Sequence, residues 1–152
     1  LHNLHGIKAP AFIPAKAKHM IKDCKLIAAR NNIRFKFNSY FPIRSLNLMR
    51  GVLVAEEDNI KNYYIDSIFN TIWQDGLNMN DDIIIQKVLK NLNVNPKTFA
   101  LRVTSSLIKD SLRTKTSNAY EKGIFGAPTY VVNNKIFWGQ DRIEFALKEA
   151  NK

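Results

Sequence analysis

The sequence has very little cysteine: Cys24 is the only one. A single thiol excludes an internal disulfide framework and any Cys-x-x-Cys redox pair within these residues. Cys24 shares a helical spacing with Met20, Ile27 and Ala28, which favours a buried structural thiol over a reactive one. Because a chain without disulfides fits a reducing compartment, we expect a cytoplasmic protein.

Long apolar runs, internal repeats and low-complexity linkers are also missing from the sequence. No run approaches the roughly 20 apolar residues that a membrane-spanning helix needs, so we expect no membrane partner. The 152 residues are 45% hydrophobic and 11% aromatic. That composition and length suffice for one folded domain with a sizeable core.

Acidic residues are scarce in the first third of the chain. Residues 1–50 contain ten Lys and Arg but only one acid, Asp23, giving a net charge of +9, whereas residues 51–152 contain thirteen basic and twelve acidic residues. Such segregation is compatible with a solvated basic face, or with the attraction of nucleic acid, an anionic membrane surface or small anions. Because no recognised nucleic-acid-binding motif accompanies the charge, we do not expect nucleic acid as a partner.

Helical patterns occupy the middle of the chain. An amphipathic spacing predicts a helix over residues 15–30, and start signals at Ser45, Asp81 and Asn95–Pro96 predict three more. The later helix starts are followed by apolar residues at helical spacing. The expected ranges after the first helix are 45–53, 58 or 59 to a stop at Gly76, 81–89, 96–107 and 110–122.

Two strand patterns follow, after a helix that ends at Gly123, a residue typical of a helix C-terminus. They flank the turn Asn133–Asn134, and Pro128 stands at the mouth of the first. A proline beside Gly and Ala at the start of a strand is compatible with a cis peptide bond, which costs little at X-Pro and usually shapes a tight turn. Such a turn would leave the amide and carbonyl of Ala127 unpaired and facing a groove, where they could pair with a peptide backbone.

This last stretch carries a resemblance. Residues 123–129, the hairpin and residues 138–142 (Trp-Gly-Gln-Asp-Arg) resemble the C-terminal half of the thioredoxin-like proteins related to kappa-class glutathione transferases. The bacterial 2-hydroxychromene-2-carboxylate isomerase branch is the nearest match. Two earlier segments agree in order and spacing, residues 10–16 and residues 38–42 with Arg50 downstream, so the resemblance covers nearly the whole chain.

The resemblance implies an α/β protein with a thioredoxin-like fold and an all-helical insertion. Residues 1–152 would form one domain, in which 15–108 are mostly the helical insertion and 109–152 supply the C-terminal helix, hairpin and helix of the thioredoxin-like half. The family begins with a strand, a helix and a second strand that have no counterpart here. We therefore expect that front piece to be absent from this chain, and either that piece or a second copy, in a homodimer, to complete the sheet.

The family binds glutathione across its thioredoxin-like groove, so the resemblance implies glutathione as the cofactor. Ala127, before a cis Pro128, would pair its backbone with the cysteinyl part. Gln140 and Asp141, at the start of the last helix, would receive the γ-glutamyl group, because helix amides suit its carboxylate and Asp141 its ammonium. Asp141 could instead be only a helix cap.

Other site residues follow from the same resemblance. Lys16 would reach the glycine carboxylate of glutathione, although the family's nearby Asn is replaced here by Ile7. Phe41 and Arg50 resemble positions near the pocket for a small aromatic carboxylate substrate; Phe41 could equally be core, and Arg50 a surface ion-pair member. The family's thiolate-stabilising serine has no match, so the catalytic residue is unknown.

The activity that the resemblance implies is a glutathione-dependent isomerisation of an aromatic keto acid, in which the glutathione thiolate adds reversibly to a conjugated double bond. Three alternatives stay open. They are a thiol-disulfide oxidoreductase of the same fold, a conjugating glutathione transferase, and a non-catalytic basic protein that binds nucleic acid or acts as a scaffold. His2 and His5 have no third partner, so we interpret both as solvated and expect no metal site.

Overall fold

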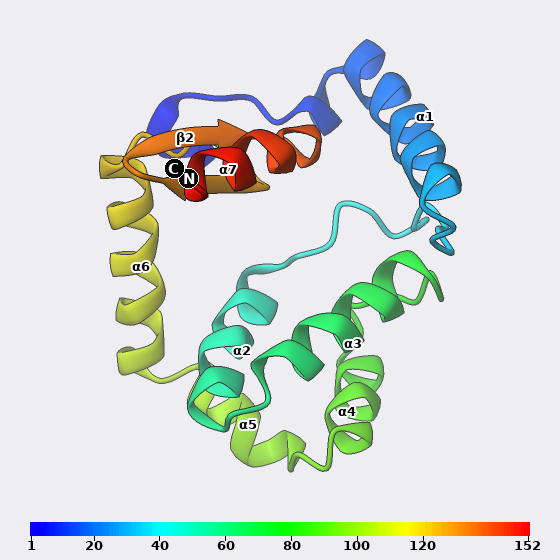
Figure 1. The fold of residues 1–152 in the computed structure, drawn as a ribbon. Coiled ribbons are helices and arrows are strands. Elements are labelled where there is room, and N and C mark those ends of the chain that lie inside the picture. Colours follow the sequence, from blue (N-terminus) through cyan, green and yellow to red (C-terminus); the bar gives the residue numbers. More distant parts are fainter.

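A computed structural model describes residues 1–152 as seven α-helices, one two-stranded hairpin and three 3-10 turns (Figure 1). The helices occupy the middle of the chain and the strands come late, as the sequence predicts. The helices are α1 (Pro14–Arg30), α2 (Leu46–Glu57), α3 (Lys61–Trp73), α4 (Asp82–Asn91), α5 (Pro96–Val103), α6 (Ser106–Glu121) and α7 (Ile143–Ala150). The strands are β1 (Thr129–Val132) and β2 (Lys135–Trp138), and the 3-10 turns are His2–His5, Pro10–Phe12 and Gln140–Arg142.

The hydrophobic core lies in the helical block formed by α2 to α5 and the start of α6, at the bottom of Figure 1. All 13 residues of the main buried cluster fall between Leu48 and Ile108. Val54 and Ala55 of α2 have no exposed surface, and Tyr64 of α3 packs beside Phe99 of α5 with ring centroids 5.5 Å apart. The expected helical insertion is therefore where most of the buried apolar surface lies.

Side-chain caps define where three of these helices begin. Asp81 accepts from the Ile83 amide at 2.8 Å, and Asn95 accepts from the amides of the two residues after Pro96. Both starts are confirmed. The structure corrects the next boundary. Helix α5 ends at Val103, and Ser105 caps the start of α6. The helix expected to begin near residue 110 therefore starts four residues earlier, at Ser106.

The hairpin joins the helical block through α6 and is covered on one face by α7 (Figure 1). Its turn residues Asn133 and Asn134 have φ values of 49° and 61°, the left-handed conformation that tight hairpins require. Glu149 of α7 binds the covered face. Its carboxylate accepts from Lys135 Nζ at 2.8 Å, and its backbone carbonyl accepts from the side-chain Nδ2 of Asn133 at 3.1 Å. The opposite face, with Val131, Ile136 and Trp138, stays exposed.

Helix α1 stands at the edge of the molecule and packs mainly against the 3-10 turn Pro10–Phe12 (Figure 1). Only Ala28 of this helix is buried. The expectation of a buried Cys24 is wrong, because its thiol is exposed: no helix covers that part of α1. Partial burial and the neighbouring Asp23 carboxylate raise the pKa of the Cys24 thiol.

None of the helices combines the length and the apolar character needed to cross a membrane.

Candidate functional site

The corner that the sequence singles out is built around a cis peptide bond between Ala127 and Pro128. The Pro128 carbonyl accepts a hydrogen bond from the Gly139 amide at 3.0 Å, one step beyond the Thr129–Trp138 pair of the hairpin. That bond places the start of β1 beside the turn that begins at Gln140. The two segments expected to meet, Ala127–Pro128 and Gln140–Asp141, therefore lie next to each other.

Ala127 presents a free backbone edge at this corner. Its amide and its carbonyl make no hydrogen bond within the chain, and the residue is exposed. A hollow of about 420 Å³ lies against it, lined by Leu1, His2, Asn3, Gly126 and Ala127. One free donor and one free acceptor on the same residue are what an extended peptide needs in order to pair as an added strand.

Close packing fixes the loop before Ala127. The Trp138 indole lies against Gly126, where a Cβ atom would come within 2.7 Å of the indole nitrogen, and its ring centroid is 5.1 Å from that of Phe125. Thr129 Oγ1 donates to the Gly126 carbonyl at 2.6 Å. Because these contacts hold Gly126 against the hairpin, the Ala127 edge is presented by a defined backbone.

Asp141 belongs to the 3-10 turn Gln140–Arg142, which precedes α7. Its carboxylate caps no helix, so the alternative that it acts only as a cap is wrong. Instead, Asp141 Oδ2 accepts from Arg142 Nη1 at 2.8 Å, and both side chains are about half exposed. Gly139 has a φ of 113°, and a Cβ atom at this position would lie 2.5 Å from Asp141 Oδ1, so glycine is required there. The corner thus carries one accessible charge of each sign.

Lys16 and Phe41 lie on other elements. Lys16 is exposed in the first turn of α1, and no hydrogen bond or ion pair joins it to the corner. Phe41 is half-buried, with its ring centroid 5.6 Å from Phe37 and 5.8 Å from Trp73. This aromatic cluster closes the loop that follows α1 against the end of α3.

Arg50 is a half-buried cation of α2 without an acidic partner. Its Nη1 donates to Asn47 Oδ1 at 3.1 Å, while its Nε is buried and makes no hydrogen bond. The alternative that Arg50 belongs to a surface ion pair is therefore wrong. An unpaired guanidinium donor is stabilised by an incoming carboxylate, which it binds with charge-assisted hydrogen bonds.

Asn38 positions Phe41, and its role was missed from the sequence. This fully buried side chain donates to the carbonyls of Ile72 and Leu77, both at 2.9 Å, and accepts from the Tyr40 amide at 2.8 Å. A second cis peptide bond, Phe41–Pro42, follows. From the sequence, Asn38 is indistinguishable from an ordinary turn residue, because the two carbonyls to which it donates lie more than thirty positions away.

His5 was also misjudged. Its Nε2 lies 2.9 Å from the Ile124 carbonyl, and its ring centroid is 4.5 Å from that of Tyr120. The interpretation of His5 as a solvated loop residue is therefore wrong: it ties the first residues of the chain to the end of α6. No group of three or more His, Cys, Asp and Glu side chains is placed to hold a metal ion.

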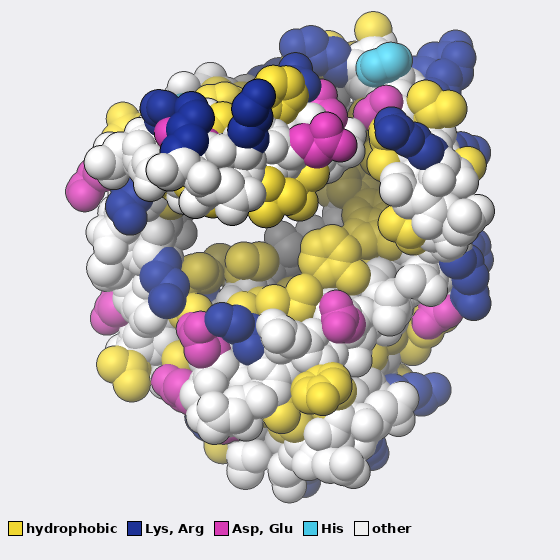
Figure 2. Space-filling model, viewed as in Figure 1, with side chains coloured by type: hydrophobic (Ala, Val, Ile, Leu, Met, Phe, Trp, Pro, Cys, Tyr) yellow, Lys and Arg dark blue, Asp and Glu magenta, His cyan; other side chains and the backbone are white.

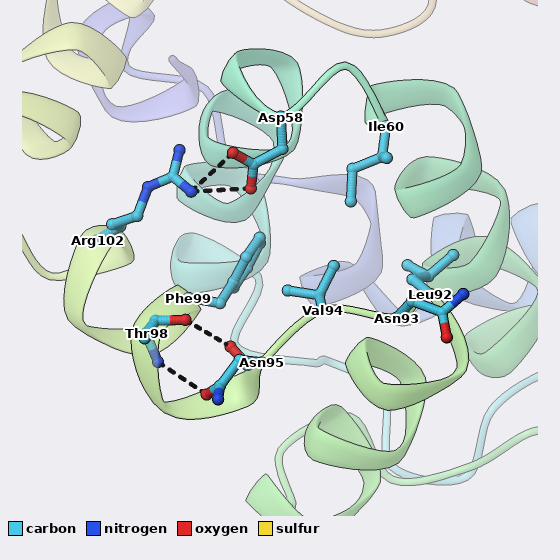
Figure 3. Close-up of a pocket in the computed structure, with 9 residues that line it drawn as sticks. All are labelled: Asp58, Ile60, Leu92, Asn93, Val94, Asn95, Thr98, Phe99 and Arg102. Atoms are coloured by element: carbon cyan, nitrogen blue, oxygen red, sulfur yellow. Dashed lines mark hydrogen bonds and ion pairs between the residues drawn. The ribbon is translucent and has the colours of Figure 1, made fainter.

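Two further surface features lie outside the corner. Figure 2 shows an opening between the hairpin layer and the helical block, with hydrophobic side chains on its walls. On the block itself, a hollow of about 330 Å³ lies between Asp58, Asn95 and Arg102 (Figure 3). Three of its polar residues are already paired, since Arg102 Nη1 bonds both Asp58 oxygens at 2.8 Å and Asn95 caps α5. The second hollow therefore offers little free hydrogen-bonding capacity.

The sequence is similar to a protein family and to curated relatives. The family model of the DSBA-like thioredoxin domain matches residues 2–150. The 2-hydroxychromene-2-carboxylate isomerase of Sphingobium xenophagum is 25% identical over 130 residues, covering 86% of this chain and 66% of that protein. The protein of the same name from Pseudomonas sp. (strain C18) is 28% identical over 87 residues, covering 57% of this chain and 41% of that protein.

Among solved structures, one of 2-hydroxychromene-2-carboxylate isomerase superposes with a TM-score of 0.82 at 21% identity, covering 95% of this chain and 70% of that one. At this identity the superposition shows the fold alone. The chain spans 66% and 41% of the lengths of the two curated relatives.

Proposed function

The chain belongs to the DSBA-like thioredoxin domain family, and from that premise we propose that the whole protein is a glutathione-dependent isomerase of an aromatic keto acid. Its fold is the α/β thioredoxin-like fold with a helical insertion. Isomerisation is supported by the two curated relatives, both of which are named 2-hydroxychromene-2-carboxylate isomerase.

The free backbone edge of Ala127 carries the glutathione part of the proposal. Glutathione is a short peptide, and its cysteinyl residue has one amide and one carbonyl to pair. The unpaired amide and carbonyl of Ala127 offer the complementary donor and acceptor beside an open hollow. Pairing of this kind depends on the backbone, so an alanine serves as well as a larger apolar residue.

The charges next to that edge suit the γ-glutamyl end of glutathione, which has both an ammonium and a carboxylate. In the proposal, Asp141 takes the ammonium, while Arg142 and the amides of the turn that begins at Gln140 face the carboxylate. Lys16 would take the glycine carboxylate at the other end. Its position in the first turn of α1, with no acidic partner, leaves its ammonium free for that role.

Arg50 and Phe41 are the proposed substrate residues. Arg50 has no acidic partner, so the exposed end of its guanidinium is available to a substrate carboxylate, and Phe41 belongs to an aromatic cluster against which a ring could stack. When bound, glutathione would supply a thiolate that adds to the conjugated double bond, which becomes single, rotates and is restored on elimination. The chain's own task is to hold the tripeptide and the keto acid in position and to orient the substrate carboxylate.

A dithiol reaction is less well supported by this chain. Cys24 is its only cysteine, and the pKa of that thiol is raised, which disfavours the thiolate needed for disulfide exchange. The lone thiol also lies on α1, an element separate from the hairpin corner. Within these residues, the corner therefore favours binding of an external thiol over an internal redox pair.

Calorimetric titration of the whole protein with glutathione tests the proposal. Asp141→Asn removes the charge that faces the ammonium, and we expect it to weaken binding roughly tenfold, about 1.4 kcal/mol. Glu144→Gln removes a carboxylate one turn away on α7 and should change affinity less than about twofold. Absence of any heat with millimolar glutathione would contradict the proposal.

A parallel assay separates isomerisation from conjugation. The keto acid should be isomerised with no net loss of glutathione, whereas a conjugating transferase would consume it with an electrophilic aromatic halide. Consumption of glutathione without isomerisation would replace the isomerase with a transferase while leaving the binding site as proposed.

A further inference from the structure

A separate pocket of about 310 Å³ opens into the helical block between the start of α2 and the helices α3, α4 and α5. Figure 1 shows these helices grouped at the bottom of the molecule, away from the hairpin. Buried apolar side chains line the pocket, each less than a tenth exposed: Leu48, Tyr64, Leu89, Phe99 and Val103. None of them belongs to the glutathione or substrate residues proposed above.

Tyr64 places one polar atom in this lining. Its hydroxyl donates to the Leu48 carbonyl at 3.3 Å, which leaves the phenol oxygen able to accept a hydrogen bond. Burial raises the pKa of Tyr64, so the phenol stays neutral at physiological pH. Gly51 makes room for this ring, because a Cβ there would overlap the Tyr64 hydroxyl. The buried part of the lining is therefore apolar and uncharged.

The mouth of the pocket has unpaired polar side chains of both signs. Asp82 and Gln86 of α4 and Lys97 of α5 line it, are exposed, and make no hydrogen bond or ion pair with other side chains. The starts of α4 and α5 also lie at this mouth, but Asp81 and Asn95 already occupy their first amides. Because the helix ends are capped and the charges balance, the mouth suits an uncharged head group with hydrogen-bonding capacity better than an anion.

We propose that this pocket binds a small amphipathic molecule, with a ring-sized apolar body against Phe99 and Val103 and an uncharged hydrogen-bonding head beside Asp82, Gln86 and Lys97. A volume of about 310 Å³ is at the lower end of small-molecule pockets, which are mostly apolar with a few placed polar groups. The pocket shares no residue with the hairpin corner and none with the proposed substrate residues, although Asn47 at its edge accepts a hydrogen bond from Arg50.

Titration with indole, followed by amide NMR of the protein, tests the site. We expect saturable shifts confined to the lining residues. Ala100→Phe adds a ring at the mouth and should weaken indole binding at least tenfold, whereas Leu101→Phe, on the exposed neighbouring position, should change it less than twofold. Shifts scattered over the surface, no saturable shift, or equal binding to both variants would overturn the proposal.

A second pair of substitutions covers the case in which the Ala100→Phe protein does not fold. Gln86→Trp on α4 should also abolish saturable binding, and Lys87→Trp, the next exposed residue outside the pocket, is its control. Indene, which has the shape of indole but no N–H donor, tests the head group. Indole should bind several times more tightly than indene, and Asp82→Asn should reduce that preference. Equal binding of indole and indene to the unaltered protein would overturn the placement of the hydrogen-bonding head group at the mouth.

Discussion

At the scale of single residues, Glu149 shows how one acid joins two elements. Its carboxylate is nearly buried between Lys135 of β2 and Lys152 beyond α7, each donating at 2.8 Å. Hydrogen bonds from Lys135 and then Lys152 lower the pKa of the Glu149 carboxyl from 4.5 to about 2. Because the folded protein binds this proton more weakly than the unfolded chain does, ionised Glu149 favours the folded state.

That linkage predicts a stability difference with a defined pH range. The contribution of Glu149 should be complete above about pH 4.5 and should disappear as the pH falls through about 2. Urea unfolding of Glu149→Gln should therefore show a lower free energy of unfolding than the unaltered protein near neutral pH, with the gap closing in acid. Glu144→Gln is the control, since Glu144 has no ion pair. A gap that is constant with pH would contradict the account.

At the scale of elements, local sequence signals work where the cause is local. Asp81 and Asn95 cap helices with amides two or three residues away, and the Asn133–Asn134 turn sets its hairpin by its own backbone. These features could be predicted. The break at Thr104–Ser105 was missed because the apolar spacing carries on past it: Leu107, expected on the buried face, is 71% exposed.

The same distinction between local and tertiary causes separates the predictable from the unpredictable residues of the candidate site. The meeting of Ala127 with Asp141 was predictable, because a short hairpin brings its two ends together. Asn38 and His5 were not, because each bonds a backbone carbonyl that only the tertiary fold brings near. The unpaired Nε of Arg50 likewise depends on what α2 packs against, which no local pattern reveals.

The cap of α5 gives a prediction at this scale. Asn95→Ala removes the acceptor for the amides of Lys97 and Thr98, so we expect it to lower the free energy of unfolding by about 1 kcal/mol. Because α5 carries the buried Phe99, the loss should appear in global urea unfolding. Asn91→Ala, an exposed substitution at the end of α4, is the matched control and should change stability by less than about 0.5 kcal/mol. Equal effects of the two substitutions would argue against the cap.

At the scale of the whole molecule, buried surface is unevenly distributed. The main buried cluster lies within residues 48–108, whereas beyond Ile108 only Ala146 and Glu149 are buried. The hairpin keeps one apolar face exposed, and α1 packs chiefly on a 3-10 turn. Free energies of local opening follow the density of buried apolar contacts, so different parts of this chain should open at different costs.

Native-state hydrogen exchange measures that difference. Amides of α2, α3 and α5 should exchange only through global unfolding, while those of β1 and β2 should exchange through a cheaper opening that leaves the block folded. Val54→Ala, at a position with no exposed surface, should lower the opening free energy of the block amides by about 2 kcal/mol. The hairpin amides should not respond, because their opening does not pass through the core of the block. If the hairpin amides lost protection in step with those of α2, the hairpin and the helical block would unfold as one cooperative unit, and the prediction of a separate opening would be wrong.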